Sequence, residues 1–185
     1  MMIEELVSSY PDFPKKGILF RDMFPILRSP SAMTSMLTTL GNFSDRLIPD
    51  YIVGIESRGF IIGTALATRQ RMGFIPIRKK GKLPGDVIGV DYSLEYGQDR
   101  LEIQSDIVKD QKILLVDDLL ATGGTVNAAA QLIDKAGGRL VGCAFVIELL
   151  GLNGSDNIPN IPITSLIKYD KTMENMEVCT WFIPR

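Results

Sequence analysis

The chain has 185 residues, of which 45% are hydrophobic and 23% charged, a composition typical of a globular protein with one full core. Its formal net charge of -2 and its pI near 5.2 give no overall basic field, so neither nucleic acid nor an anionic membrane is expected as its main partner. Histidine is absent, and proton transfer therefore has to fall to Glu, Asp, Lys or Tyr.

The two cysteines, Cys143 and Cys179, are too few for a disulfide scaffold and fit a reducing compartment. Residues 1–7 contain early acids and no long apolar run, so they predict neither a signal peptide nor a membrane span. We therefore expect a cytoplasmic protein that folds as a single domain over residues 1–185.

The first elements in chain order are short and irregular. Apolar residues recur at helical spacing over residues 3–10, which predicts a short helix. Residues 11–25 are dense in proline and aromatic side chains and cannot be regular throughout. Ser29 and Pro30 form an N-cap and a first helical position, and a helix is expected from there through Arg46.

The rest of the chain alternates apolar strands with helices, which predicts an α/β fold with a mainly parallel open sheet flanked by helices. The expected strands are residues 51–55, 73–77, 112–116 and 140–147, with 163–169 as an edge strand, and the expected helices are 61–71 and 126–136. Ligands of such sheets collect where loops leave the carboxyl ends of the strands. Three of these strand ends carry charged or glycine-rich loops.

The loop after residues 112–116 begins with Asp117 and Asp118 and continues with small residues. Its small residues are Ala121, Thr122, Gly123, Gly124 and Thr125. The N–H groups of the last three would point outward with the positive end of the next helix, which favours a phosphate. Because two aspartates repel a bare anion, the ligand should also present sugar hydroxyls or hydrated Mg²⁺ to them. A polar turn without a ligand is the alternative interpretation.

Residues 116–125 resemble the ribose-phosphate signature of type I phosphoribosyltransferases. In that family two acids meet the ribose hydroxyls and the following loop binds the 5-phosphate, so the resemblance implies the same roles here. Residues 56–60 resemble the family's pyrophosphate loop, with Arg58 at the position that holds the β-phosphate. Relatives often have a cis peptide at this point, which would be the Glu56–Ser57 bond here. A local cap or ion pair is the other interpretation of Arg58.

The run that follows residues 73–77 contains Arg78, Lys79 and Lys82. Charge runs are usually solvated. This run, however, should lie at the same carboxyl edge as the other two loops, where a ligand with several phosphate charges needs cations. These three residues are therefore candidates for the pyrophosphate end of the site.

Residues 81–103 have few core signals and an alternating pattern that predicts a hairpin lid. Residues 92–97 closely resemble the mobile-loop motif of adenine phosphoribosyltransferases. The resemblance assigns proton transfer at the purine to Glu95 and substrate binding to Tyr96. By residue type alone, Glu95 would be a solvated lid charge.

Residues 10–30 are similar to the N-terminal hood of the same family. The resemblance makes Phe20 the ring that stacks on the purine and Leu19 and Arg21 the residues whose backbone reads its edge. Leu149, at the end of the 140–147 strand region, is expected to complete the purine pocket. Many relatives have an uncharged residue and a proline where this chain has residues 15–16, both lysine.

The resemblance covers about residues 10–170 and implies transfer of the 5-phosphoribosyl group from 5-phosphoribosyl 1-pyrophosphate to N9 of adenine, giving AMP and pyrophosphate. It implies Arg58 and Lys79 as stabilisers of the leaving group, a homodimer, and Mg²⁺ held mainly through substrate and water near Asp117 and Asp118. A phosphoribosyltransferase for another base and a non-catalytic sugar-phosphate sensor of the same fold are the alternatives. Residues 171–185 lie outside the resemblance.

Overall fold

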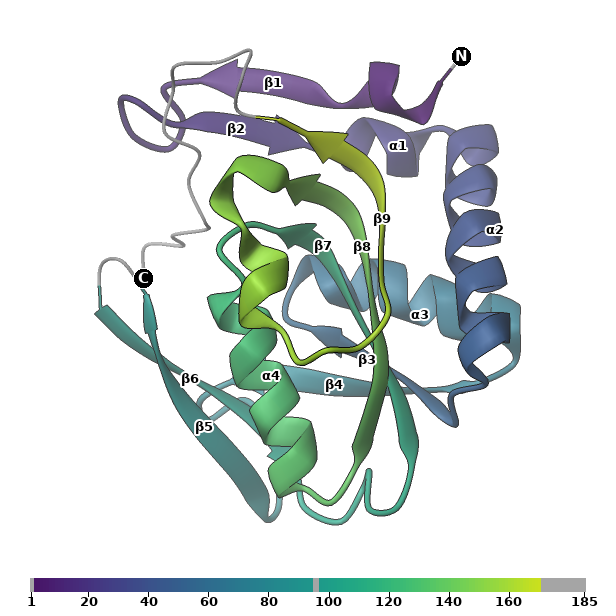
Figure 1. Ribbon diagram of the computed structural model, residues 1–185, viewed down its shortest axis with the longest axis vertical. Coiled ribbons are helices and arrows are strands. Elements are labelled where there is room, and N and C mark those ends of the chain that lie inside the picture. The colour runs from purple at the N-terminus through teal and green to yellow at the C-terminus, as the bar shows by residue number, and fades with distance from the viewer. Residues whose placement is uncertain (1, 95–96, 171–185) are drawn as a thin grey trace.

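The computed structural model describes residues 2–94 and 97–170, and it confirms an α/β architecture built on one large sheet (Figure 1). The seven strands lie in the order β5-β6-β4-β3-β7-β8-β9. Their bounds are β3 (Tyr51–Ile55), β4 (Gly73–Lys79), β5 (Val87–Leu94), β6 (Gly97–Gln104), β7 (Lys112–Leu120), β8 (Arg139–Leu149) and β9 (Ile163–Tyr169).

The sheet is mainly parallel, as predicted. The neighbours from β4 through β3, β7 and β8 to β9 pair in parallel, whereas β6 joins β4 in antiparallel orientation and β5 pairs with β6 as a hairpin. The hairpin and the edge position of β9 match the sequence analysis. The helices are α1 (Phe24–Arg28), α2 (Pro30–Leu47), α3 (Arg58–Gln70) and α4 (Gly124–Lys135), with short 3₁₀ turns η1 (Ile3–Leu6), η2 (Leu150–Leu152) and η3 (Gly154–Asn157).

Helices cover both faces of the parallel strands. Ile52 packs with α2 and α3 on one face, and the next residue, Val53, packs with α4 on the other. Leu114 and Leu115 divide between the two faces in the same way. Successive side chains of a strand point to opposite faces, so burial on both sides explains why these strands have continuous apolar runs. Within the described part of the chain, no helix combines the length and apolarity needed to cross a bilayer.

The N-terminal segment corrects one prediction. The prediction of a helix over residues 3–10 is wrong. In this segment only η1 is helical, and the residues after it form strand β1 (Ser8–Pro11). This strand pairs antiparallel with β2 (Leu19–Asp22), a pairing that local helical spacing does not reveal. The helix predicted from Ser29 and Pro30 is confirmed as α2, whose Ser29 hydroxyl accepts the Ala32 N–H at 3.4 Å.

Strand β7 is longer than the predicted 112–116. It runs on to Leu120 because β8 continues beside it, with Leu119 opposite Ile147 and Leu120 opposite Glu148. The two aspartates therefore lie in the strand and not in the loop, and a rigid element orients them.

Close backbone contact brings the start of α3 against this strand. A Cβ atom on Gly59 would lie 2.9 Å from Asp117 Oδ1, and one on Gly54 would lie 2.6 Å from the Gly59 carbonyl oxygen. Both values are shorter than real Cβ contacts, so only glycine permits this approach. The neighbouring Arg58 is thereby placed beside the two aspartates.

Candidate active site

A pocket opens at the carboxyl edge of the sheet, where β3, β4 and β7 end. The β5–β6 hairpin, which lies beside α4, closes one side of it. The lining residues are Ile55, Glu56, Ser57, Arg58, Lys79, Tyr92, Asp117, Asp118, Leu119, Ala121, Thr122, Gly123, Gly124, Thr125 and Val126. The pocket thus brings together the two loops that the sequence predicted as phosphate sites. It also contains Lys79, one of the three cations predicted in the third loop.

The two aspartates occupy different environments. Asp118 is 6% exposed and forms an ion pair with Arg58 at 2.5 Å, whereas Asp117 is half-buried and accepts the Asp118 N–H at 2.9 Å. Burial, and next the charge of Asp118, raise the pKa of Asp117 well above its ordinary value. Burial also raises the pKa of Asp118, but the Arg58 guanidinium opposes that shift.

Residues 121–125, here called the phosphate loop, connect β7 to α4. Gly123 has φ +80°, a left-handed conformation that favours glycine, and its carbonyl accepts the Asn127 N–H of the first turn of α4 at 2.8 Å. The α4 helix of 12 residues therefore begins inside the pocket, and its free N–H groups and dipole favour an anion there.

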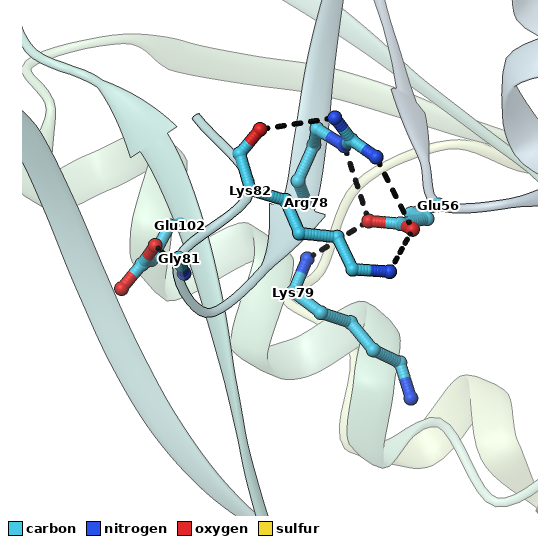
Figure 2. Close-up of polar contacts among 6 residues, drawn as sticks. All are labelled: Glu56, Arg78, Lys79, Gly81, Lys82 and Glu102. Carbon is cyan, nitrogen blue, oxygen red and sulfur yellow. Dashed lines mark hydrogen bonds and ion pairs between the residues drawn. The ribbon is translucent and has the colours of Figure 1, made fainter. Parts of the chain in front are cut away.

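Residues 78–82, here called the cation loop, are held by a carboxylate. Glu56 accepts from Lys82 Nζ at 2.8 Å, from Arg78 Nε at 3.2 Å and from the Lys79 N–H at 3.2 Å (Figure 2). On the far side of the loop, the Gly81 N–H donates to Glu102 at 2.8 Å. Burial raises the pKa of Glu56, but the hydrogen bonds from Lys82, Arg78 and Lys79 outweigh it, and the net pKa is lowered.

The three predicted pyrophosphate cations therefore do not act alike. Arg78 and Lys82 point to Glu56 and are not among the pocket-lining residues, whereas the Lys79 side chain points away from Glu56 (Figure 2) and does line the pocket. Its ammonium forms an ion pair with Asp99 of β6 at 2.9 Å.

Two residues of the hairpin that were missed as site residues connect Lys79 to the phosphate loop. Tyr92 lines the pocket, and its hydroxyl lies 3.5 Å from Asp99, its cross-strand partner. Burial and the Asp99 charge raise the pKa of Tyr92 to about 12, while a hydrogen bond from Thr125 opposes the shift. Tyr92 is the first residue of the motif over residues 92–97, so the sequence could have indicated it. Asp99 lies outside that motif, and only the register of β5 and β6 shows that it is the neighbour of Tyr92.

The residues predicted to bind the purine are not among those that line this pocket. Leu19 is buried in β2, and Phe20 meets Phe13 edge to face with ring centroids 5.2 Å apart. The Arg21 guanidinium lies 4.1 Å from the ring centre of Tyr169, which holds the hood against the end of β9 (Figure 1). Leu149 is buried at the end of β8, and none of the predicted purine-binding residues, Leu19, Phe20, Arg21 and Leu149, lines the pocket.

Glu95 and Tyr96 lie outside the described residues, so their predicted roles rest on the sequence. Over residues 2–94 and 97–170 there is no cluster of three side chains able to ligate a metal ion. The Glu56–Ser57 peptide bond is cis, as the resemblance implied.

Comparison with known proteins identifies the family. A model of the phosphoribosyl transferase domain matches residues 40–168. The adenine phosphoribosyltransferase of Prochlorococcus marinus (strain MIT 9313) is 59% identical over 171 residues, which cover 91% of this chain and 99% of that protein. The chain belongs to the adenine phosphoribosyltransferase family.

Solved adenine phosphoribosyltransferases have the same fold. The enzyme of Thermoanaerobacter pseudethanolicus aligns with a TM-score of 0.87 and 42% identity, covering 90% of this chain and 98% of its own. The Saccharomyces cerevisiae enzyme, in complex with D-2,5-dideoxy-2,5-imino-altritol 1,6-bisphosphate and adenine, aligns with a TM-score of 0.85 and 38% identity, covering 89% and 96%. These adenine phosphoribosyltransferase structures confirm the fold predicted from the sequence.

Proposed function

We propose that this protein transfers the 5-phosphoribosyl group from 5-phosphoribosyl 1-pyrophosphate to N9 of adenine, giving AMP and pyrophosphate. The observation that carries the proposal is the pocket, in which an aspartate pair adjoins a backbone phosphate cradle. The related yeast enzyme binds adenine together with a bisphosphate, which supports the same two kinds of ligand here.

In this proposal the phosphate loop holds the 5-phosphate through backbone N–H groups at the start of α4. Asp117 and Asp118 accept hydrogen bonds from the ribose hydroxyls. Arg58 fixes Asp118 through the 2.5 Å ion pair, and its guanidinium, which lines the pocket, has the planar geometry that suits phosphate oxygens. The sugar is thus held from both sides by groups that the fold has already oriented.

The chemical step separates charge. Positive charge develops at C1 of the ribose while negative charge develops on the departing pyrophosphate. Lys79, which lines the pocket, is proposed to stabilise the pyrophosphate, and Arg78 and Lys82 are proposed to add positive potential from their positions beside Glu56. Asp117 and Asp118 supply negative potential beside the sugar.

The donor set fits Mg²⁺ bound mainly through substrate and water. Asp118 is engaged by Arg58, so Asp117 is the carboxylate more open to a hydrated ion. When bound, Mg²⁺ would neutralise part of the negative charge of the pyrophosphate.

The base is proposed to bind under the hood. Adenine presents a 6-amino donor beside the N1 acceptor, whereas hypoxanthine presents the opposite pattern. Backbone groups around Leu19 and Arg21 would pair with only one of these patterns, and such a site discriminates by on the order of 10⁴. Phe20 is proposed to stack on the base, Leu149 to complete the purine pocket, Tyr96 to bind substrate and Glu95 to transfer the proton.

Three broader features belong to the same proposal: a single domain with a hood and a mobile hairpin lid, a homodimer, and a cytoplasmic location. The homodimer and the lid come from the family resemblance. The location is proposed from the low cysteine content.

A nucleobase panel tests the function. Purified protein is mixed with 5-phosphoribosyl 1-pyrophosphate and Mg²⁺, and nucleotide formation is followed with adenine, hypoxanthine, guanine, uracil and orotate. AMP formation from adenine alone is the expected result. Product from another base would overturn the assignment of the hood, and tight sugar-phosphate binding without any product would favour a sensor of the same fold.

A further inference from the structure

The outer side of the phosphate loop rests on the 3₁₀ turn η3, which follows β8. A Cβ atom on Gly154 would lie 2.1 Å from the Ala121 carbonyl oxygen, and one on Gly123 would lie 2.2 Å from the Gly154 carbonyl oxygen. The two backbones therefore touch without any side chain between them. Gly154 is buried by this contact although the residues that follow it in the turn are exposed.

One side chain connects the turn to the loop by a hydrogen bond. Asn157 Nδ2 donates to the Thr122 carbonyl oxygen at 2.8 Å. The Thr122–Gly123 peptide is trans and planar, so its carbonyl and its N–H point in opposite directions. Because the Thr122 carbonyl points toward the Asn157 side chain, the N–H of Gly123 points away from that side chain, and Gly123 itself lines the pocket.

The next peptide is fixed as well. The Gly123 carbonyl accepts the Asn127 N–H within α4, so its direction is set by the helix. The orientation of the peptide before Gly123 is thus set by Asn157, and the orientation of the peptide after it is set by α4. Donors that are oriented before the ligand arrives need no reorganisation when it binds.

We propose that Asn157 is a positioning residue for the sugar phosphate, acting through the Thr122–Gly123 peptide. It does not touch the substrate, and it aims a backbone donor at the 5-phosphate. The inference rests on the proposed function, which places the 5-phosphate in the phosphate loop.

The test compares Asn157→Ala with Asn160→Ala, a matched change at a nearby exposed asparagine without a hydrogen bond to the loop. Loss of one well-placed hydrogen bond should raise the Kd for ribose 5-phosphate and the KM for 5-phosphoribosyl 1-pyrophosphate by about three- to tenfold. The KM for adenine should not change. Since Asn157 is exposed, the Tm should fall by no more than about 2 °C. Asn160→Ala should match wild type in all four measurements.

A second variant tests the backbone contact. Gly154→Ala places a methyl group against the Ala121 carbonyl and should weaken ribose 5-phosphate binding more than Asn157→Ala does. Equal binding by wild type and both variants would overturn the inference and leave the proposed function standing. Wild type that fails to bind ribose 5-phosphate would overturn both the inference and the assignment of the pocket.

Discussion

The phosphate loop and the cation loop lie at the same edge of the sheet but are held in different ways. Glycine contacts and hydrogen bonds to Asn127 and Asn157 hold the phosphate loop. Side-chain ion pairs to Glu56 hold the cation loop. Backbone N–H groups keep the direction that the fold gives them. Cations on long, flexible side chains can instead change rotamer and pair with a nearby anion.

In the proposed site, the half assigned to the sugar phosphate has its backbone held in place by the fold itself. In the half assigned to the pyrophosphate, the cations are paired with the protein's own carboxylates, Glu56 for Arg78 and Lys82, and Asp99 for Lys79. A pyrophosphate would have to compete with these carboxylates. Binding to the cation loop should therefore weaken with salt more than binding to the phosphate loop.

The largest expected effect is at the ion pair below the phosphate loop. Asp118→Asn removes the carboxylate 2.5 Å from the buried Arg58, whose charge Asp117 and Asp22 also compensate, so it should cost at most about 3–5 kcal/mol of unfolding free energy and should raise the KM for 5-phosphoribosyl 1-pyrophosphate. Urea unfolding and the KM for 5-phosphoribosyl 1-pyrophosphate measure the two effects.

Asp117→Asn is the matched control. The pKa of Asp117 is raised in the fold, so its ionisation destabilises the protein as pH rises from the ordinary value of 3.8 through the folded pKa. The variant should remove that pH dependence and lose less stability than Asp118→Asn. Equal losses in the two variants would contradict the different roles assigned to the pair.

A second prediction compares glycines in the two loops. Gly123→Ala combines a φ of +80° with the clash against Gly154 and should lower kcat/KM by about a hundredfold, because it displaces oriented donors. Gly81→Ala has a similar φ of +75° but open space around its Cβ atom, so only backbone strain of about 1 kcal/mol is expected. Steady-state kinetics of both variants decide the matter, and similar losses would refute the comparison.

A third prediction concerns the cation loop. Glu56→Gln keeps the size of the side chain and removes the charge between Arg78 and Lys82, which should cost about 1 kcal/mol of stability after solvent screening. Because the pKa of Glu56 is lowered, its stabilisation is present above the ordinary value of 4.5 and is lost as pH falls through the folded pKa.

The wild-type advantage over Glu56→Gln should therefore shrink below pH 4.5, as thermal unfolding across pH would show. Added salt should shrink it in the same way, because Lys82 is exposed. An advantage that persists at low pH and in high salt would mean that the Glu56 side chain acts through packing.

The smallest effect is expected at the contact between the hairpin and the pocket. Tyr92→Phe removes a hydroxyl whose 3.5 Å distance to Asp99 is long for a hydrogen bond, so a loss of only about 0.5 kcal/mol is expected. Since the pKa of Tyr92 is about 12, the activity profile between neutral and mildly alkaline pH should not change in shape. A shifted profile would assign Tyr92 a proton-transfer role.

The sequence alone determined the fold class, most of the strands and helices, and the two loops that line the pocket and are predicted to bind phosphate. Strands buried on two faces leave long apolar runs, and phosphate loops need small residues at fixed places after a strand, so both features are local in the sequence. The resemblance also supplied the expected cis peptide at Glu56–Ser57, which the structure contains.

Tertiary structure decided which charged side chains meet. Strand β1 forms because its partner β2 lies beside it, and β7 extends past Asp118 because β8 does. The partners Glu56 for Arg78, Asp99 for Lys79 and Asn157 for Thr122 come from other segments of the chain. Charges and amides on flexible side chains bind whatever the fold brings within reach, and that distance is set by the register and packing of whole elements.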